Sequence, residues 1–423
     1  MQETLVDVAG RAYGRKAAHP DLDLVSCRPG TQGGELLRRY WQPVALSSEA
    51  SNLPKLIKVL DEELILFRNG AGEPGLLYPR CAHRGTSLLY AKVEEEGLRC
   101  CYHGWLYSPD GHCLETPCEP QSEVKDRVRQ PWYPVVERYG LIFAYMGPAD
   151  REPAFPVISL EQNLGEDERL LATRNTSGPN GPHPKIAAYQ DYNWFQVFDN
   201  VADPFHVMIT HEMINGTQFV ASFGVMPEVE SKYLADGVMN RSMRRLPDGR
   251  LHQRLAQMIM PNMHCTPGVT DEDLSYSSLG WIVPEDDTHY HHFFLYRVGA
   301  AESHLKTFET LGFLKDEWGP SHGKPFREWS LEDHQQWQTD YVTQKGQGDI
   351  TLHSEEHLTV ADTGIGMTRR MFKRQAALVA SGGDPVGAGP GFERLIDIRA
   401  GNAFLDPETG AMLAGITPPW EAL

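Results

Sequence analysis

The stretch CAHRGTSLLYAKVEEEGLRCCYHGW, residues 81–105, decides the fold of this chain because it holds two cysteine–histidine pairs. Cys81 and His83 form a C-x-H pair, and Cys100 and His103 form a C-x-x-H pair separated from the first by sixteen residues. Both pairs stand beside turn-forming glycines, so we expect two loops that project their side chains from a sheet toward one point. Two thiolates and two imidazoles at this spacing predict a metal or iron–sulfur site.

The ligand types leave two kinds of site open. A structural zinc site would accept the same four side chains. However, the order C-x-H followed by C-x-x-H is unusual for zinc ribbons and fingers, and it matches the Rieske pattern, in which two cysteines hold one iron and two histidines hold the other. The spacing to His103 selects Cys100 rather than Cys101 as the ligand. We expect Cys101 to be a packed thiol or a neighbour of the ligands.

The sequence around this stretch alternates short apolar runs with turn signals. From Leu56 to Gly147, runs such as LIKVL and LILFR are separated by turns such as Asn69-Gly70, a pattern typical of a compact all-β domain. Prolines follow this stretch, and we place a domain boundary near residue 150. Elsewhere we expect a short helix within 33–43, helical segments within 186–213, 325–347 and 366–380, and strands within 217–300, of which HYHHFFLYRV is the clearest.

Composition narrows the class of protein. At 423 residues the chain is long enough for two domains. The formal net charge of −18 argues against nucleic acid or an anionic membrane as partner, although a local basic patch is possible around Arg244, Arg245 and Arg250. The absence of a long apolar run or signal peptide predicts a cytoplasmic protein. Seven cysteines, an odd number, argue against a disulfide framework.

The run CAHRG…RCCYHGWLYSPDGHC resembles the cluster-binding segment of the Rieske non-haem iron oxygenases, and PWYPVVERYGLIFAYMGP at 131–148 resembles the end of that domain. The resemblance implies an α+β fold, with an all-β Rieske [2Fe-2S] domain joined to a larger α+β catalytic domain whose antiparallel sheet is flanked by helices. It divides the chain into an N-terminal helical segment that packs with the catalytic domain (1–40), the Rieske domain (41–150) and the catalytic mononuclear iron domain (151–423).

A second set of potential ligands lies in NWFQVFDNVADPFHVMITH at 193–211, where Asp203, His206 and His211 have D-x-x-H-x-x-x-x-H spacing. Two histidines and a carboxylate are the ligands of non-haem Fe(II) oxygenases. Asp203 followed by Pro204 predicts a helix N-cap with proline at the first helical position. On an ideal helix the two histidines lie about 140° apart, so spacing alone leaves open an ordinary helix with two unrelated histidines.

The same segment resembles the mononuclear iron segment of the Rieske oxygenases, which implies that His206 and His211 bind the iron. In that family the position of Asp203 is not a ligand. It bridges, by hydrogen bonds, a histidine of the Rieske site in the neighbouring subunit, here His103 or His83, and a histidine at the iron, here His206. The resemblance therefore gives Asp203 a catalytic role in connecting the two metal sites.

The third iron ligand comes from a resemblance farther along the chain. The carboxylates in the right part of the sequence are Asp333, Asp340, Asp349, Glu355, Glu356 and Asp362. The segment 335–370 resembles the C-terminal portion of the phthalate dioxygenase-like branch, in which the ligand aspartate stands shortly before a glycine and a later Glu-His-Leu, here Gly348 and 356–358. Counting back through that resemblance selects Asp340 and leaves Asp362 as a structural residue before the next helix.

The resemblance also implies an activity and its partners. No G-x-G-x-x-G follows a strand and no second cysteine cluster is present, so the electron donor must be a separate reductase that draws on NAD(P)H. Electrons would pass to the cluster and then to the mononuclear Fe(II), which uses O₂ to oxygenate an aromatic substrate, expected to be an aromatic acid. Electron transfer between subunits implies a homotrimer or a stacked hexamer.

Two alternatives stay open. The same metals would serve a monooxygenase that performs O- or N-demethylation. Alternatively, the chain is a non-enzymatic Rieske electron carrier or a zinc-stapled module, which leaves the long remainder beyond residue 150 without a role. His264, His292 and Arg297 are candidate binders of a substrate carboxylate, although alternate polar residues on a strand are typical of a solvated face.

Overall fold

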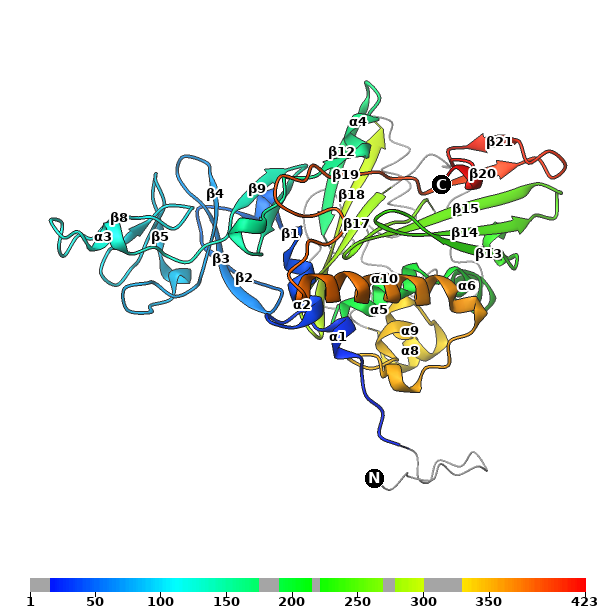
Figure 1. The fold of residues 1–423 in the computed structure, drawn as a ribbon, viewed down its shortest axis with the longest axis horizontal. Helices are drawn as coiled ribbons and strands as arrows, with labels where there is room; N and C mark the ends of the chain where they lie inside the picture. The colour runs from blue at the N-terminus through cyan, green and yellow to red at the C-terminus, as the bar shows by residue number, and fades with distance from the viewer. Residues whose placement is uncertain (1–15, 175–189, 215–220, 269–277, 300–328) are drawn as a thin grey trace.

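The computed structural model describes residues 16–174, 190–214, 221–268, 278–299 and 329–423. Within these residues the chain is an elongated α+β molecule, with small β-sheets at one end and a large sheet flanked by helices at the other (Figure 1). Parts of the predicted ranges 1–40, 186–213, 217–300 and 325–347 lie outside the described residues.

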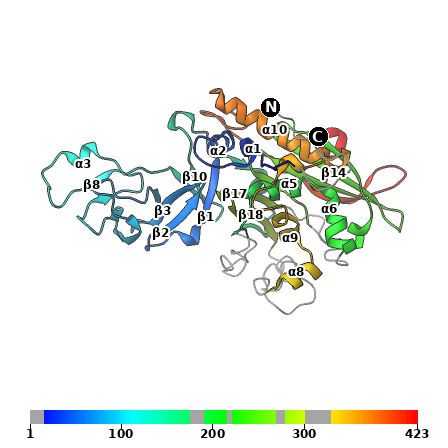
Figure 2. The same ribbon diagram turned by 90° about the horizontal axis from the view of Figure 1, so that it is seen from below.

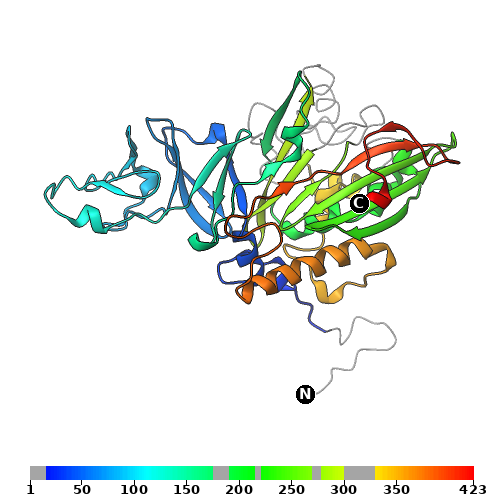
Figure 3. The same cartoon turned by 45° about the horizontal axis from the view of Figure 1, so that its top comes forward.

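The N-terminal β region consists of three small antiparallel sheets (Figure 1). The first contains, in spatial order, β1 (Trp41–Leu46), β10 (Leu141–Tyr145) and β9 (Val135–Arg138). The second contains β2 (Lys55–Val59), β3 (Glu62–Arg68) and β4 (Pro74–Leu77). The third contains β5 (Lys92–Val93), β6 (Leu98–Arg99), β7 (Leu106–Tyr107) and β8 (Cys113–Glu115), with the short helix α3 (Val124–Arg127) nearby. All three views place this third sheet at the end of the molecule farthest from the large sheet (Figures 1–3).

The predicted helix at 33–43 is present but shorter. It forms α2 (Gln32–Arg38), which follows the short helix α1 (Leu22–Val25). The Thr31 side chain caps α2 by accepting a hydrogen bond from the Gly34 N–H at 3.1 Å. Pro43 does not close the helix, because it lies inside β1. α2 packs against the long helix α10 (Thr363–Ala380), so this N-terminal segment contacts the C-terminal half of the chain (Figure 1).

The large sheet is antiparallel throughout and has the order β12-β18-β17-β16-β15-β14-β13, with β20 beside β15 and β21 beside β20. Its strands are β12 (Glu168–Arg174), β13 (Glu228–Tyr233), β14 (Gly237–Arg245), β15 (Leu251–Ile259), β16 (Met263–Cys265), β17 (Ser278–Asp286), β18 (His289–Gly299), β20 (Gly401–Leu405) and β21 (Met412–Gly415). The predicted strand HYHHFFLYRV is confirmed as most of β18. The C-terminal hairpin β20–β21 lies beside β15 (Figure 3). A separate parallel pair joins β11 (Val157–Ile158), just before α4 (Ser159–Gln162), to β19 (Leu395–Ile396).

One face of the large sheet is covered by helices, two of which carry the predicted iron ligands (Figures 1 and 2). These are α5 (Trp194–Val201), α6 (Pro204–Met208) with its continuation, α8 (Leu331–Gln336), α9 (Asp340–Lys345) and α10. The Asn240 side chain of β14 donates a hydrogen bond at 2.8 Å to the Ala202 carbonyl between α5 and α6. A Cβ on Gly364 of α10 would lie 2.5 Å from the Asn240 amide oxygen, so glycine is required for this close approach.

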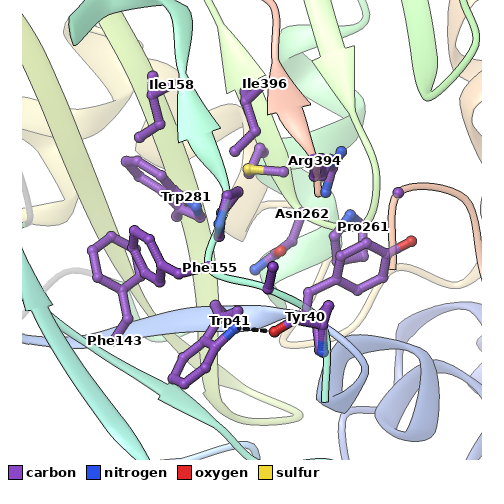
Figure 4. Close-up of a pocket in the computed structure, with 15 residues that line it drawn as sticks. Tyr40, Trp41, Phe143, Phe155, Ile158, Pro261, Asn262, Trp281, Arg394 and Ile396 are labelled. Atoms are coloured by element: carbon purple, nitrogen blue, oxygen red, sulfur yellow. Dashed lines mark hydrogen bonds between the residues drawn. The ribbon is translucent and has the colours of Figure 1, made fainter. Parts of the chain in front are cut away.

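The β region and the large sheet share a continuous apolar core. Phe143 of β10 packs edge-on against Trp281 of β17, with ring centroids 5.8 Å apart. A cavity of about 20 Å³, room for one water, lies at this junction (Figure 4). Trp41 lines it and donates its indole N–H to the Pro153 carbonyl at 3.1 Å. None of the predicted metal ligands lines this cavity, so it belongs to the packing between the two regions.

The longest helix described is α10, with 18 residues, and it carries several arginines and lysines. Across the described ranges, no helix has the combination of length and apolar character that spanning a membrane requires.

Two candidate metal centres

The two cysteine–histidine loops, residues 81–85 and 100–104, share one backbone construction, and we call them the cluster loops. In each, the cysteine N–H donates to the carbonyl five residues ahead (2.9 Å from Cys81, 2.8 Å from Cys100). A glycine N–H then donates back to the cysteine carbonyl (2.8 Å from Gly85, 3.0 Å from Gly104). Both glycines have positive φ, +74° and +75°, which favours glycine. The glycine that follows each pair is therefore required by the loop geometry.

The four side chains of the cluster loops suit a two-iron cluster better than one zinc ion. Around a single zinc, ligand atoms at 2.0–2.3 Å from the metal lie within about 4 Å of one another. In the described part of the chain, three or more potential ligands within 4.8 Å occur at one place, and it does not involve the cluster loops. The arrangement instead has two pairs, because Cys81 and Cys100 are 4% and 3% exposed whereas His83 is exposed. This separation fits a cluster with its cysteine-bound iron inside and its histidine-bound iron at the surface.

Three further observations fit a two-iron cluster held by the cluster loops. The Nδ1 atom of His103 is buried without a hydrogen-bond partner, and the His83 and His103 rings lie 4.6 Å apart. Burial raises the pKa of the Cys100 thiol, and the neighbouring Cys81 raises it further. Two adjacent buried thiols become thiolates together only when a cation neutralises them, as iron does.

Residues that sequence reasoning missed hold the cluster loops in place. The fully buried Gln130 accepts from the Ala82 N–H at 2.8 Å and donates to the Arg80 carbonyl at 2.9 Å. The Tyr107 hydroxyl lies 3.1 Å from the Cys81 sulfur. A lone glutamine and a strand tyrosine carry no motif, so only the folded chain identifies them. Of the two expectations for Cys101, a packed thiol or a neighbour of the ligands, the packed thiol is wrong, because this side chain is exposed.

The structure brings His206, His211 and Asp340 together, and we call them the iron triad. Each offers a ligand atom, and these atoms lie within 4.8 Å of one another. Oδ1 of Asp340 is 3.3 Å from Nε2 of His211 and 3.7 Å from Nε2 of His206. Asp340 is the first residue of α9, 129 positions after His211 in the sequence, so tertiary packing creates this group.

A π-helical segment resolves the spacing problem of the two histidines. Asp203 caps α6 as predicted, accepting from the Phe205 N–H at 2.9 Å, with Pro204 at the first helical position. After Met208 the helix continues as a π-helix, Ile209–Ile214, which contains His211. Its i→i+5 hydrogen bonds widen the turn and reduce the angle between residues five apart. The two imidazole rings consequently lie with centroids 5.5 Å apart rather than diverging.

A hydrogen bond fixes the orientation of the His206 ring within the triad. Its Nδ1 lies 2.5 Å from the Asp203 carbonyl oxygen, and a carbonyl only accepts, so Nδ1 carries the proton. Nε2 is then left as the metal-binding lone pair. The Asn200 amide nitrogen lies 3.3 Å from this Nε2 and 3.3 Å from Oδ1 of Asp340. A metal on Nε2 would take its lone pair, so the hydrogen bond to Asp340 is the one that Asn200 can keep in the loaded site.

The electrostatics of the triad suit a divalent cation. Burial by itself raises the pKa of Asp340, but the hydrogen bond and charge of His211, followed by the charge of His206, lower the pKa to about 2. An ionised carboxylate beside two imidazole nitrogens is the donor set that non-haem Fe(II) uses. The residues present therefore fit a mononuclear iron.

The other carboxylates near the triad have structural partners. The Asp362 carboxylate accepts from the Thr359 N–H and hydroxyl in the turn before α10, as its predicted structural role requires. Arg369 of α10 pairs with Glu356 and with Asp199 of α5. This ion-pair network fastens α5, in which Asn200 directly follows Asp199, to α10.

Comparisons with known proteins agree with this geometry. The family model of the Rieske [2Fe-2S] domain matches residues 40–136. The chain is 42% identical to the phenoxybenzoate dioxygenase subunit alpha of Ectopseudomonas oleovorans, over 94% of each chain. It is 35% identical to the oxygenase subunit of the tert-butanol monooxygenase / tert-amyl alcohol desaturase of Aquincola tertiaricarbonis, over 88% of this chain and 79% of the relative.

A third relative is the 5,5'-dehydrodivanillate O-demethylase oxygenase subunit of a Sphingobium strain, 29% identical over 87% of this chain and 82% of the relative. Among solved structures, dicamba monooxygenase bound to dicamba has the same fold, with a TM-score of 0.58, 18% identity, and coverage of 82% of this chain and 99% of that chain. The cluster loops, the iron triad and the near full-length similarity lead to one conclusion: the chain belongs to the Rieske non-haem iron oxygenases, as an α (oxygenase) subunit.

Proposed function

We propose that this oxygenase holds its [2Fe-2S] cluster in the cluster loops, through Cys81, His83, Cys100 and His103, and its mononuclear iron in the iron triad. The single observation that carries the proposal is the convergence of two imidazoles and one ionised carboxylate from distant helices. When bound, the cluster supplies single electrons and the iron activates O₂. The chain's own residues hold the ligands in position: Asn200 donates a hydrogen bond to Asp340, and the π-helical segment aligns the histidines.

We propose that electrons pass between subunits. The sheet that carries the cluster loops and the helices that carry the iron triad lie at opposite ends of one chain in all three views (Figures 1–3). A neighbouring subunit in a ring can bring its cluster loops to this chain's triad, which supports a homotrimer, alone or stacked as a hexamer. A separate reductase, with or without a ferredoxin, would deliver NAD(P)H electrons to the exposed histidine end of the cluster.

Asp203 is our proposed contact between the two centres. Its backbone carbonyl accepts from His206, and its carboxylate, 29% exposed, caps α6 and lies 4.0 Å from the same imidazole. The exposed part of the carboxylate is free to accept from His103 or His83 of a neighbouring subunit. Asp203→Asn should leave both metals bound and abolish turnover. Full activity in a metal-replete Asp203→Asn enzyme would remove Asp203 from this role.

The proposed domain division is 1–40, 41–150 and 151–423. The packing of α2 on α10 supports the assignment of the first segment to the catalytic domain, although residues 1–15 lie outside the described residues. The match of the Rieske domain to residues 40–136 supports the second. We also propose a cytoplasmic location.

The substrate that we propose is an aromatic acid. The support comes from the phenoxybenzoate dioxygenase subunit at 42% identity. The second candidate, O- or N-demethylation by the same metals, is supported by the O-demethylase subunit at 29% identity. A carrier or zinc module does not account for the iron triad.

Oxygen consumption and product analysis test the function. Purified holoenzyme is supplied with NADH, a surrogate reductase and a panel of aromatic acids and aryl methyl ethers. We expect substrate-dependent O₂ uptake with at least one aromatic acid, and a hydroxylated or cis-diol product. Formaldehyde release from a methyl ether would favour demethylation. A metal-replete enzyme that takes up no O₂ with any member of the panel would contradict the proposal.

A further inference from the structure

Two buried arginines in the large sheet have no counter-ion among the described residues. Arg244 of β14 and Arg254 of β15 are 1% and 6% exposed. Arg244 donates to the Val225 carbonyl at 3.1 Å, and its Nη1 is buried without a partner. Arg254 donates to the Gly268 carbonyl at 2.7 Å and to the Asn402 amide oxygen at 3.3 Å. No carboxylate of the described ranges lies within ion-pair distance of either guanidinium.

The neighbouring arginines behave differently, which makes this pair distinctive. Arg241 pairs with Glu230 at 2.5 Å, and Arg250 pairs with Asp248 at 2.7 Å. An unpaired buried charge costs several kcal/mol, and this chain has an excess of carboxylates, with a net charge of −18. Two cations kept in the interior without a carboxylate from the described ranges indicate a site for an anion.

The two guanidiniums converge on one aromatic ring. Opposite residues of antiparallel strands lie on the same face, and the register pairs Arg244 with His252 and Ser242 with Arg254. Both guanidinium carbons lie over the Phe223 ring, 5.3 Å and 5.2 Å from its centroid. The His252 ring stacks on the Phe223 ring, with the two ring centroids 5.9 Å apart. Arg244, Arg254, His252 and Phe223 form what we call the arginine cluster.

The charge state of the cluster matches an anion site. Burial lowers the pKa of Arg244 to about 10, and burial followed by the charge of Arg244 lowers the pKa of Arg254 to about 9. Both side chains are therefore still cationic at neutral pH. Burial, and then the charges of both arginines, lower the pKa of His252 to about 3, so the imidazole between them is neutral. The cluster therefore carries two positive charges that no carboxylate of the described residues compensates.

The arginine cluster lies on the face of the sheet that carries the iron centre. Arg244 and Asn240 are four residues apart on β14 and share a face, and Asn240 bonds to the Ala202 carbonyl beside the start of α6. Phe223 belongs to a short 3₁₀ turn, Ala221–Gly224, that packs against the π-helical segment containing His211. The turn that carries Phe223 therefore connects the arginine cluster to the helix that carries His206 and His211.

We propose that Arg244 and Arg254 bind the carboxylate of an aromatic acid and so position its ring at the mononuclear iron. The inference rests on the proposed oxygenation of aromatic acids and adds the residues that select them. A carboxylate suits the pair because each guanidinium offers parallel N–H donors to its two oxygens. Phe223 contributes an apolar surface under the guanidiniums.

Equilibrium binding to the holoenzyme tests this proposal without requiring turnover. Benzoate, phthalate and 3-phenoxybenzoate are titrated calorimetrically into the wild-type enzyme, each beside its uncharged amide. We expect at least one acid to bind, and its amide to bind at least tenfold more weakly. Arg244→Gln and Arg254→Gln should each weaken binding of the acid by about thirtyfold or more, which is the loss of affinity expected when a buried charge pair loses one partner. Both variants should leave the affinity for the amide within about twofold.

Arg245→Gln is the matched control, because Arg245 is the exposed neighbour on the same strand and should not change either affinity. Arg244→Lys should retain part of the preference for the acid. Visible absorption of the cluster reports whether each variant is assembled. Should a glutamine variant fail to assemble, Arg244→Lys supplies the comparison, and a preference for the acid that this variant leaves unchanged would remove Arg244 from the site.

Three results would overturn the inference: no acid binds the wild-type enzyme, acid and amide bind alike, or the arginine variants weaken both equally. The last result is the one expected if the arginines only stabilise the fold. These failures differ from failure of the proposed function. If O₂ uptake depends on substrate but acid and amide bind alike, only the role of the arginine cluster is refuted. If acid binding depends on the arginines but no O₂ is taken up, the proposed oxygenation is refuted.

Discussion

Replacing Arg369 with methionine should destabilise the fold around the iron triad by about 3–5 kcal/mol. The Arg369 guanidinium contacts Asp199 at 2.6 Å and Glu356 at 2.5 Å, and the three side chains are 13%, 14% and 23% exposed. Methionine keeps an apolar stem of similar length but leaves two carboxylates facing each other without a cation. Breaking a buried ion pair from one side costs about 3–5 kcal/mol, because the remaining charge stays desolvated. Thermal unfolding of the holoenzyme should show a midpoint lower by about 3–9 °C, because the entropy of unfolding grows with the size of the unit that unfolds.

The pH dependence of this loss follows from Asp199. Burial is the main cause that raises its pKa, from an ordinary value of 3.8 to about 6, and Arg369 opposes the shift. A carboxyl whose folded-state pKa is raised contributes stability that is present below its ordinary pKa and is lost as the pH rises through about 6. Removing the arginine should raise this pKa further. The loss of stability in Arg369→Met should therefore be smaller at pH 5 than at pH 8.

Two controls isolate the ion pair. Arg370→Met changes the exposed neighbour on the same helix and should alter stability by less than about 0.5 kcal/mol. Adding Asp199→Asn to Arg369→Met should recover part of the loss, because the unpaired charge is gone. Equal unfolding midpoints for Arg369→Met and Arg370→Met would refute the reasoning. A loss that is the same at pH 5 and pH 8 would remove Asp199 as its source.

Three further outcomes are expected. Cys100→Ser should abolish the visible absorption and acid-labile sulfide of the cluster, whereas Cys101→Ser, at an exposed thiol, should retain both; equal loss in both would contradict the choice of ligand. Asp340→Asn should weaken binding of the sulfide-independent iron by more than about 100-fold, because losing even a residue that hydrogen-bonds to a ligand weakens metal binding by about 10–100-fold. The sulfide content, which reports the cluster, should stay unchanged as the control. Gly104→Ala should cost about 1 kcal/mol or more and lower cluster content, because φ is +75° and a proline ring lies 3.2 Å from the added Cβ. Gly72→Ala, with φ +90° and open space, should retain full cluster content.

The cluster loops illustrate what local sequence can predict. Each loop is a short closed turn whose ligands lie within four residues of one another, so the order of cysteine, histidine and glycine was enough to predict a loop that projects its ligands. The cap of α6 is local in the same way, since Asp203 bonds to the N–H groups that follow it. Both features were predictable because backbone geometry over a few residues depends on those residues.

The iron site shows where that reasoning stops. On an ideal helix the spacing of His206 and His211 argued against a shared ion, and the π-helical segment that reconciles them has no sequence signal that we could read. Asp340 was selected by resemblance rather than by physical derivation, since no spacing rule connects residues 129 positions apart. Asn200 and Gln130 went unnoticed, because an amide acquires its role only from what surrounds it.

The arginine cluster sharpens the same distinction. The sequence suggested a basic surface patch at Arg244, Arg245 and Arg250, but strand alternation sends Arg244 into the interior and leaves Arg245 exposed. The sequence by itself determined the family, the cluster loops and the start of the iron-bearing helix, because those depend on local residue order and on resemblance. Only the tertiary structure decided which distant groups meet at the iron triad and which arginines lose their counter-ions, because burial and pairing depend on how strands and helices pack.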